Sequence, residues 1–434
     1  MDNMRGVTAG TGEDKLLYPN TSGAEATGGN RGDFNATGFS VVNSGDVNNA
    51  GENFIYLAIR RPNKPVTLAS QVFAVVPNTG TGVAKSVAGF GFSPDMVISK
   101  IKSGNGAAIY DRLRGVNLEI YPEQTTVETT RSNTLMSFDM DGISVGADGG
   151  GYINNVTYSP YIWWNFKRAP GVFDVVAYTG VGTAGATVSH NLGVVPELII
   201  AKIRGSHSGD WIVYDKDIGN SWYLALNGSA GKQDGSSVPN AWNNTTPTAS
   251  VFSLGNAGGG SNYSGDNYIA YLFATKAGVS KVGSYTGNGA SQTINAGFSV
   301  PARFVLIKRT DVAGDWYVWD SARGIVDGND PHLSLNSNVA EVANDDSIDT
   351  DNSGFIVNQV GATNINVANG TYIYLAFSGV AYPPTGASVS SSGGQASLLW
   401  TNPIDASFNG ITILRSLSSI ISSLVSSITY TTGT

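Results

Sequence analysis

An internal repeat constrains this chain more than any other feature of its sequence. A segment rich in Tyr, Trp, Phe, Ile and Leu recurs at residues 54–58, 161–164, 268–273 and 372–377. The starts of these segments are 107, 107 and 104 residues apart. A fixed period of this length indicates a structural module that is copied along the chain, so the fold must accommodate several copies of one unit.

Two further markers keep the same period. One carries an acidic residue followed by a glycine, near residues 2–6, 110–115, 214–219 and 319–324. The other begins with Pro and ends with Lys, at residues 94–100, 196–202 and 301–308. The markers divide the chain into a half-module, three whole modules that we number 1 to 3, and a C-terminal segment, at residues 1–65, 66–170, 171–277, 278–381 and 382–434.

The half-module is predicted to be incomplete, because the Pro-to-Lys marker has no counterpart before residue 2. A sheet that lacks strands leaves backbone donors and acceptors open for pairing. We therefore expect either that the chain is one section of a longer polypeptide or that another chain supplies the missing strands.

Within a module, short apolar or alternating runs are separated by Gly, Asn and Asp at the spacing of about 8–12 residues that is typical of sandwiches and barrels. The chain contains 55 Gly, a residue that tolerates the positive φ of tight turns. The sequence predicts an all-β chain of tandem antiparallel β-sandwich modules, with a jelly roll as one topology, arranged along a fibre.

The repeated aromatic segment is apolar on both faces. In residues 161–166, Tyr161 and Trp163 would point to one side of a strand, and Ile162, Trp164 and Phe166 to the other. A strand that faces water on one side alternates apolar with polar residues. A second surface must therefore cover the strand, either a neighbouring module or another copy of the chain, and we favour a symmetric homo-oligomer wound along an axis.

Charge and composition exclude several classes of partner. The net charge of −8 and a pI near 4.9 oppose binding through phosphates, so we expect no nucleic acid. The chain has no Cys, which excludes disulfides and thiolate metal sites. No stretch approaches the roughly 18 apolar residues of a membrane span, and residues 1–11 lack the apolar core of a signal peptide, so we expect no membrane insertion.

The residues that could perform catalysis show no catalytic pattern. His190, His207 and His332 fall at non-equivalent points of the modules and are expected on the surface or in turns. Acidic runs at 139–142 and 345–354 precede the same strand in two modules, which indicates polar hairpin turns rather than the paired acids of a glycosidase. We predict no enzymatic activity and no cofactor.

One acidic stretch, residues 349–354, overlaps a calcium-binding loop. The twelfth position of that loop is Val360, where the helix-loop-helix site needs a bidentate Glu. We therefore assign no metal ligands, although a looser calcium site between strands remains an open alternative.

Residues particular to one module are better binding candidates than residues that every module shares. In module 2 these are Trp222, Trp242, Asn243 and Asn244, since aromatic faces beside amides suit sugar rings. Packing in a core or an interface is the alternative. The shared Arg5, Arg114 and Arg323 could bind an acidic sugar, but we interpret them as corner residues that bond carbonyls or the nearby acid.

The order of these motifs resembles a module found in tail-fibre and other virion fibre proteins of tailed phages. The likeness rests on residues 91–94, 96–100, 110–115, 142–145 and 161–166 and covers residues 1–381. It implies β-sandwich modules in a homo-oligomeric fibre, with a trimer favoured. Module 2 departs from the pattern, because Ile218 stands where the other modules have Arg.

The C-terminal segment differs from the modules. Residues 387–415 resemble the opening strands of a fibronectin type III sandwich, so we predict a partial fibronectin type III-like segment at 382–434. Residues 417–428 follow helical spacing on a serine background, which departs from the sandwich pattern.

Together these features predict a structural component of a phage tail fibre or other virion fibre that contributes to host attachment. It would be located in the virion and extracellular when mature, and its partners would be itself, other virion proteins and host-surface polysaccharide. The alternatives are a bacterial cell-surface adhesin or carbohydrate-binding module array and, as the enzymatic class, a glycan depolymerase.

Overall fold

The computed structural model describes most of the three modules and parts of the flanking segments. The described residues are 16–26, 31–34, 38–41, 47–58, 65–158, 160–235, 241–256, 260–379, 385–392 and 395–401. Their only helical elements are two 3-10 turns, η1 (Ala69–Gln71) and η2 (Val156–Tyr158), and every other regular element is a β-strand. The predicted all-β class is confirmed. In this part of the chain no helix is long and apolar enough to cross a membrane.

Each whole module is a two-layered β-sandwich with a larger and a smaller antiparallel sheet. In module 1 the larger sheet has the order β3 (Phe73–Asn78), β11 (Tyr161–Phe166), β5 (Met96–Ile101) and β6 (Ala107–Asp111). The smaller sheet has the order β4 (Lys85–Ala88), β10 (Gly142–Val145) and β9 (Leu135–Asp139), and a short ribbon joins β7 (Leu118–Glu119) to β8 (Thr129–Thr130).

Modules 2 and 3 repeat this plan. The larger sheet of module 2 runs β12 (Phe173–Thr179), β19 (Asn267–Phe273), β14 (Leu198–Ile203), β15 (Trp211–Asp215), β16 (Trp222–Ala225), β17 (Gln233–Asp234), opposite β13 (Thr187–Ser189) and β18 (Val251–Ser253). That of module 3 runs β20 (Ser280–Thr286), β27 (Thr371–Ser378), β22 (Ala302–Arg309), β23 (Trp316–Asp320), β24 (Leu333–Ser334), opposite β21 (Gln292–Asn295), β26 (Gly354–Val357) and β25 (Ile348–Asp351).

The repeated aromatic segment is the second strand of each larger sheet, paired on both sides. In module 1, Trp164 on β11 lies opposite Val75 of β3 and Ile98 of β5. Tyr161 and Trp163 belong to the module's own sandwich core, whereas Ile162, Trp164 and Phe166 face a second core. This arrangement explains why the strand is apolar on both faces.

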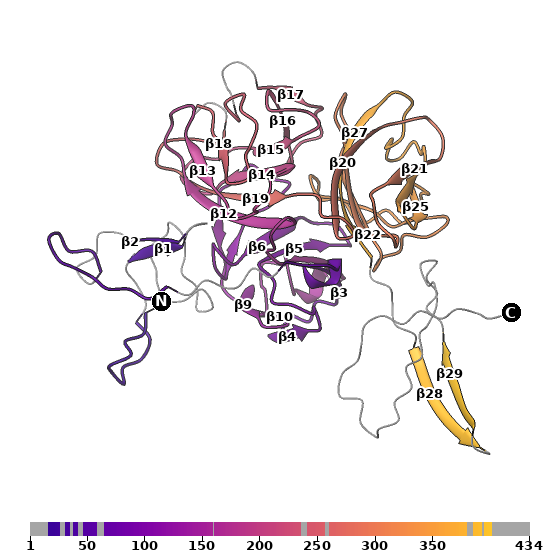
Figure 1. Cartoon of the computed structure of the whole chain (residues 1–434), viewed down its shortest axis with the longest axis horizontal. Helices are drawn as coiled ribbons and strands as arrows, with labels where there is room; N and C mark the ends of the chain where they lie inside the picture. The colour runs from indigo at the N-terminus through magenta and orange to yellow at the C-terminus, as the bar shows by residue number, and fades with distance from the viewer. Residues whose placement is uncertain are drawn as a thin grey trace.

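The second core is shared by all three modules. The ring of Phe73 on β3 lies 5.0 Å from Phe166 in its own module and 5.1 and 4.7 Å from Phe304 and Phe377 in module 3. Phe166 in turn lies 5.8 Å from Phe273 of module 2. The modules therefore surround a common centre (Figure 1) rather than follow one another in a line. The covering surface is a neighbouring module, so the two-faced strands give no argument for an oligomer.

Three equivalent lysines close the ring. They are the last residues of the Pro-to-Lys markers, and each is fully buried at a junction between two modules. Each ammonium donates to a carbonyl of its own module. Each also donates to a carbonyl of an adjoining module at 2.5–2.9 Å: Lys100 to Ser337, Lys202 to Thr125, Lys308 to Ser229. Burial lowers the pKa of all three lysines to about 8. The sequence showed that these lysines repeat, but it did not show that they form hydrogen bonds between modules.

The N-terminal part differs from the prediction. Residues 54–58, expected to form the aromatic strand, have no strand assignment, and Ile55, Tyr56 and Leu57 are exposed. No described strand pairs with the backbone of this segment, and the ring of Tyr56 lies 5.2 Å from that of Phe39. Among the described residues of this part, β1 (Gly32–Phe34) pairs with β2 (Phe39–Val41), and Leu16 forms an isolated antiparallel bridge with Ala26. Residues 2–6, the first copy of the acidic marker, lie outside the described residues.

Beyond module 3, β28 (Thr385–Ser392) and β29 (Gln395–Thr401) form an antiparallel hairpin that stands apart from the three modules in Figure 1. Two opening strands are what a fibronectin-like segment requires, and the assignment to that fold stays a prediction. The stretch with helical spacing, residues 417–428, lies outside the described residues.

Candidate functional site

The four residues predicted to bind a glycan do not form one site. Trp242 lies in the sandwich core of module 2, where only 2% of it is exposed. Its ring is 5.9 Å from that of Tyr214 and 6.4 Å from that of Phe252. A buried ring cannot present its face to a sugar, so for Trp242 the alternative of core packing is the one that the structure supports.

The other three residues lie nearer the surface. Trp222 on β16 is half-buried against the shared core, and the Lys232 ammonium lies 4.7 Å from the centroid of its ring. Asn243 and Asn244 occupy a turn with φ of 54° and 48°, a conformation that Asn tolerates better than most residues. Glycan binding therefore stays a prediction for Trp222, Asn243 and Asn244.

The repeated Asp and Arg form buried pairs at module corners, as interpreted from the sequence. Arg114 Nε is 2.5 Å from Asp111 Oδ2, and Arg323 Nε is 2.6 Å from Asp320 Oδ2. The four side chains are at most 1% exposed, so these arginines are not available to a sugar acid. A neighbouring module adds a second donor to each carboxylate, the Tyr271 hydroxyl at 2.8 Å from Asp111 and the indole of Trp164 at 2.9 Å from Asp320.

The third corner lacks both donors. At the equivalent positions module 2 has Ile218 and module 3 has Leu375, while the acid, Asp215, is retained and buried. Oδ1 of Asp215 accepts a hydrogen bond from the backbone amide of Asp217, and Oδ2 has no partner among the described residues. Burial raises the pKa of Asp215 to about 8, so this carboxyl group holds a proton at neutral pH.

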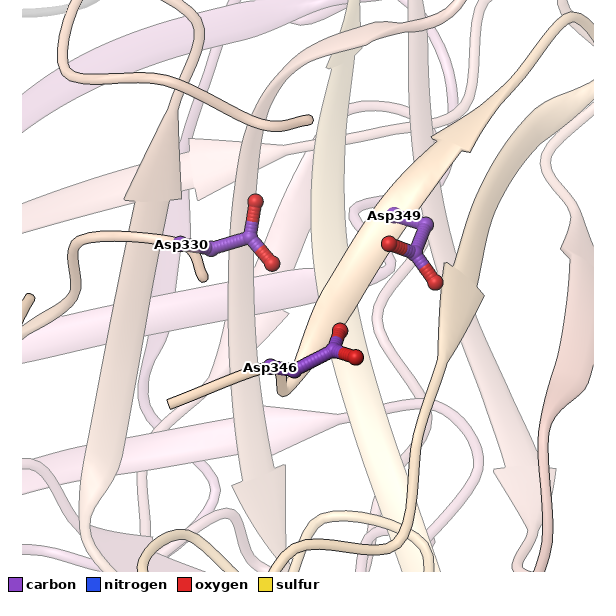
Figure 2. A group of neighbouring side chains, drawn as sticks. All are labelled: Asp330, Asp346 and Asp349. Carbon is purple, nitrogen blue, oxygen red and sulfur yellow. The ribbon is translucent and has the colours of Figure 1, made fainter. Parts of the chain in front are cut away.

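An acidic cluster on module 3 is the arrangement closest to a metal site. Figure 2 shows the carboxylates of Asp330, Asp346 and Asp349 directed toward one another, and one oxygen from each lies within 4.8 Å of the others. Asp349 is on β25 and Asp346 just precedes it, so both come from the acidic run noted in the sequence. Asp330 comes from the segment before β24, and the sequence analysis missed it because nothing local connects the two segments.

The partners of this cluster limit what it can do. Asp330 already accepts hydrogen bonds from the amides of Val326 and Ile348, and Asn358 donates to both Asp346 and Asp349. Oxygen ligands suit a hard cation such as calcium. Burial, helped by the charges of the other two carboxylates, raises the pKa of Asp330 to about 7, so the cluster can instead hold a proton.

The acidic runs otherwise serve turns, as predicted. The hairpin that joins β9 to β10 holds Asp141, whose carboxylate accepts hydrogen bonds from the amides of Gly89 and Gly91 at 3.1 and 2.7 Å. In the hairpin between β25 and β26, Asp351 accepts a bond from the amide of Ser353 at 2.8 Å. These carboxylates order the backbone.

The histidines were expected on the surface or in turns, and a surface position is wrong for two of the three. His207 is exposed, as expected, but His190 and His332 are buried. The ring of His190 bonds the carbonyl of Thr248 at 3.1 Å, and His332 lies 3.2 Å from Asp345. Burial lowers the pKa of both buried histidines, which favours neutral rings that fill the interior.

Comparison with protein-family models gives a match. The model of a domain of unknown function, DUF7483, matches residues 68–380. The search of curated proteins and the search of solved structures each returned no match. The matched range begins and ends within two residues of the span of modules 1 to 3, so the family unit coincides with the closed ring rather than with one module. The chain therefore belongs to the DUF7483 family, whose domain consists here of three β-sandwich modules around a shared core.

Proposed function

We propose that this chain is a structural section of a virion fibre, such as a phage tail fibre, and that it contributes to attachment at the host surface. The observation that carries the proposal is the closed ring of three modules. It gives a chain without cysteines one large apolar core, which is the kind of body that keeps its shape outside a cell without disulfides. The resemblance of the modules to those of phage fibres points the same way.

The positions of the groups with shifted pKa values favour a structural role over an enzymatic one. Asp215 and the lysines Lys100, Lys202 and Lys308 have some of the largest shifts, and all four are buried where modules meet. Shifted pKa values mark catalytic sites when the group also lies in a cleft that a substrate can enter. At these junctions the shifts follow from burial between modules.

Electron microscopy of the purified protein, combined with its mass in solution, tests the proposal. A fibre section should form elongated particles with three-lobed bodies and a mass that is a multiple of 45.2 kDa, with a trimer expected from the resemblance. A compact monomer would contradict the fibre proposal.

Attachment is tested separately, by binding of the labelled protein to host cells. A Trp222→Ala variant should bind less if the half-buried indole contacts a surface glycan, whereas Val339→Ala, at an exposed residue of module 3, should bind as the parent does. Equal binding by both variants would exclude Trp222 as the contact.

Two further experiments distinguish a virion fibre from a bacterial cell-surface adhesin and from a glycan depolymerase. Antibody labelling of an envelope adhesin would decorate intact bacteria, whereas a fibre protein would be found on particles after lysis. A glycan depolymerase would shorten host polysaccharide on incubation, and a fibre protein would leave its size distribution unchanged.

A further inference from the structure

The three junctions between modules use equivalent positions but not equivalent side chains. At the junction of modules 1 and 2, Glu128 joins two arginines at 3.1 Å each, Arg114 of module 1 and Arg204 of module 2. Arg114 also pairs with Asp111, and the carboxylate of Asp111 accepts a hydrogen bond from the hydroxyl of Tyr271. A buried chain of charge-assisted hydrogen bonds thus links the two modules.

The junction of modules 3 and 1 has the same chain. Glu341 joins Arg323 of module 3, at 3.3 Å, to Lys102 of module 1, at 3.0 Å. Arg323 pairs with Asp320, and the carboxylate of Asp320 accepts a hydrogen bond from the indole N–H of Trp164. The amide of Glu341 also donates to the carbonyl of Lys102 at 2.8 Å, which fixes the register of the two segments.

The junction of modules 2 and 3 keeps only the first acid of this chain. The backbone bond that fixes the register is present, from the amide of Lys232 to the carbonyl of Thr310 at 2.8 Å. Lys232 therefore stands where Glu341 does, and Thr310 where Lys102 does. With Ile218 and Leu375 in place of the arginine and the aromatic donor, Asp215 loses every side-chain partner that its counterparts have.

Retaining a buried acid without its partners should weaken the junction of modules 2 and 3. Replacing all members of a buried ionic network by apolar groups can be neutral or stabilising, whereas removing the partners of one buried acid and keeping the acid is costly. The 2–3 junction is of the second kind, since Asp215 is 1% exposed and its Oδ2 is unpaired among the described residues. Hydrogen bonds to backbone carbonyls still cross this junction, from the side chains of Lys308 and Trp316 to Ser229 and Ala225, and from the amides of Gly314 and Lys232 to Ser229 and Thr310.

We propose that the ring opens at the junction of modules 2 and 3 before it opens at either other junction. Module 3 would swing away from module 2 while the charged chain holds it to module 1. The short connection between β19 and β20 keeps the two modules attached, so the opening is a hinge motion that exposes the shared core at one side only. This conformational property is independent of whether the chain is a virion fibre.

Hydrogen exchange in the full chain tests the proposal at matched amides. The amide of Gly209 donates to Thr125 across the 1–2 junction, at 3.0 Å, and that of Gly314 donates to Ser229 across the 2–3 junction, at 2.8 Å. Both junctions also have a covalent connection, which makes the comparison fair. We expect Gly314 to exchange at least about tenfold faster than Gly209. The charged hydrogen bonds that hold the 1–2 junction closed are stronger than neutral ones, and the 2–3 junction lacks them, so it should open more often. Equal or slower exchange at Gly314 would overturn the proposal.

A repair variant supplies a second arm. Ile218→Arg with Lys232→Glu restores the acid–arginine–acid sequence of the other corners and should slow exchange at Gly314 while leaving Gly209 unchanged. The converse change, Arg114→Ile, should speed exchange at Gly209. If the repaired protein folds and Gly314 exchanges as fast as in the parent, the missing ionic chain is not the cause of opening and the proposal fails. If either variant does not fold, the comparison of amides in the parent still decides.

Discussion

Two buried carboxyl groups, those of Asp215 and Asp330, should make the free energy of unfolding depend on pH. Asp215, whose pKa is raised to about 8, and Asp330, whose pKa is raised to about 7, keep a proton in the folded chain that they lose in the unfolded chain. Both are carboxylic acids with a raised pKa, so the folded state binds more protons than the unfolded state between about pH 4 and these values. Their contribution to the free energy of unfolding therefore falls as pH rises.

We predict that Asp215→Asn removes part of this dependence. In the parent, the contribution of Asp215 to the free energy of unfolding should fall by up to about 1.4 kcal/mol per pH unit between about pH 4 and pH 8. The asparagine variant has no proton to lose, so it should gain stability relative to the parent as pH rises. Urea unfolding of both proteins at about pH 5 and pH 8 measures this difference. Parallel pH profiles for the two proteins would show that Asp215 is not protonated in the folded chain.

At the scale of elements, the close approach of strands in the smaller sheets depends on glycine. Gly142 begins β10, opposite Ala88 on β4. A Cβ atom at this position would lie inside van der Waals contact with the carbonyl oxygen of Val87. The equivalent Gly354 begins β26 and has the same close neighbour, the carbonyl oxygen of Ile294. The glycine after each acidic turn is therefore required by strand packing.

We predict that Gly142→Ala destabilises the protein by about 1–3 kcal/mol, since β4 must move away from β10 to admit the methyl group. Gly149→Ala is the matched control, because a Cβ atom at Gly149 would have no neighbour within 4 Å. Thermal or urea unfolding of the two variants gives the comparison. Equal stability of the two would mean that the smaller sheet adjusts to the methyl group without loss.

At the scale of the whole molecule, the shared core should make the three modules unfold together. Phe166 of module 1 contacts Phe273 of module 2 and Phe304 and Phe377 of module 3, with ring centroids 5.6–6.1 Å apart. All three modules contribute side chains to this core, so a substitution at its centre should destabilise all three. The sandwich cores, by contrast, each belong to one module.

We predict that Phe166→Ala costs about 3–5 kcal/mol and speeds hydrogen exchange in β11, β19 and β27 alike. Phe138→Ala, in the sandwich core of module 1, is the control, and its local effect should concentrate in β4, β9 and β10. Hydrogen exchange followed by mass spectrometry distinguishes the two patterns. An effect of Phe166→Ala that stays within module 1 would show that the modules unfold independently.

The all-β class and the repeat period could be predicted from the sequence, because alternation, turn residues and repeat spacing are local properties of the chain. The sequence also placed Arg114 and Arg323 at corners and the acidic runs in turns, since each of these acts on residues a few positions away. These predictions needed no knowledge of how distant segments meet.

What covers the second face of each aromatic strand could not be predicted from the sequence. The sequence showed that Trp164 and Phe166 must be covered, and the same apolar pattern fits a neighbouring module or another copy of the chain equally well. The burial of Trp242 and His190, the meeting of Asp330 with Asp346, and the lack of a partner for Oδ2 of Asp215 among the described residues likewise depend on contacts between distant segments. Hydrophobic burial is not directional, so a sequence can state that a face is buried without stating against what.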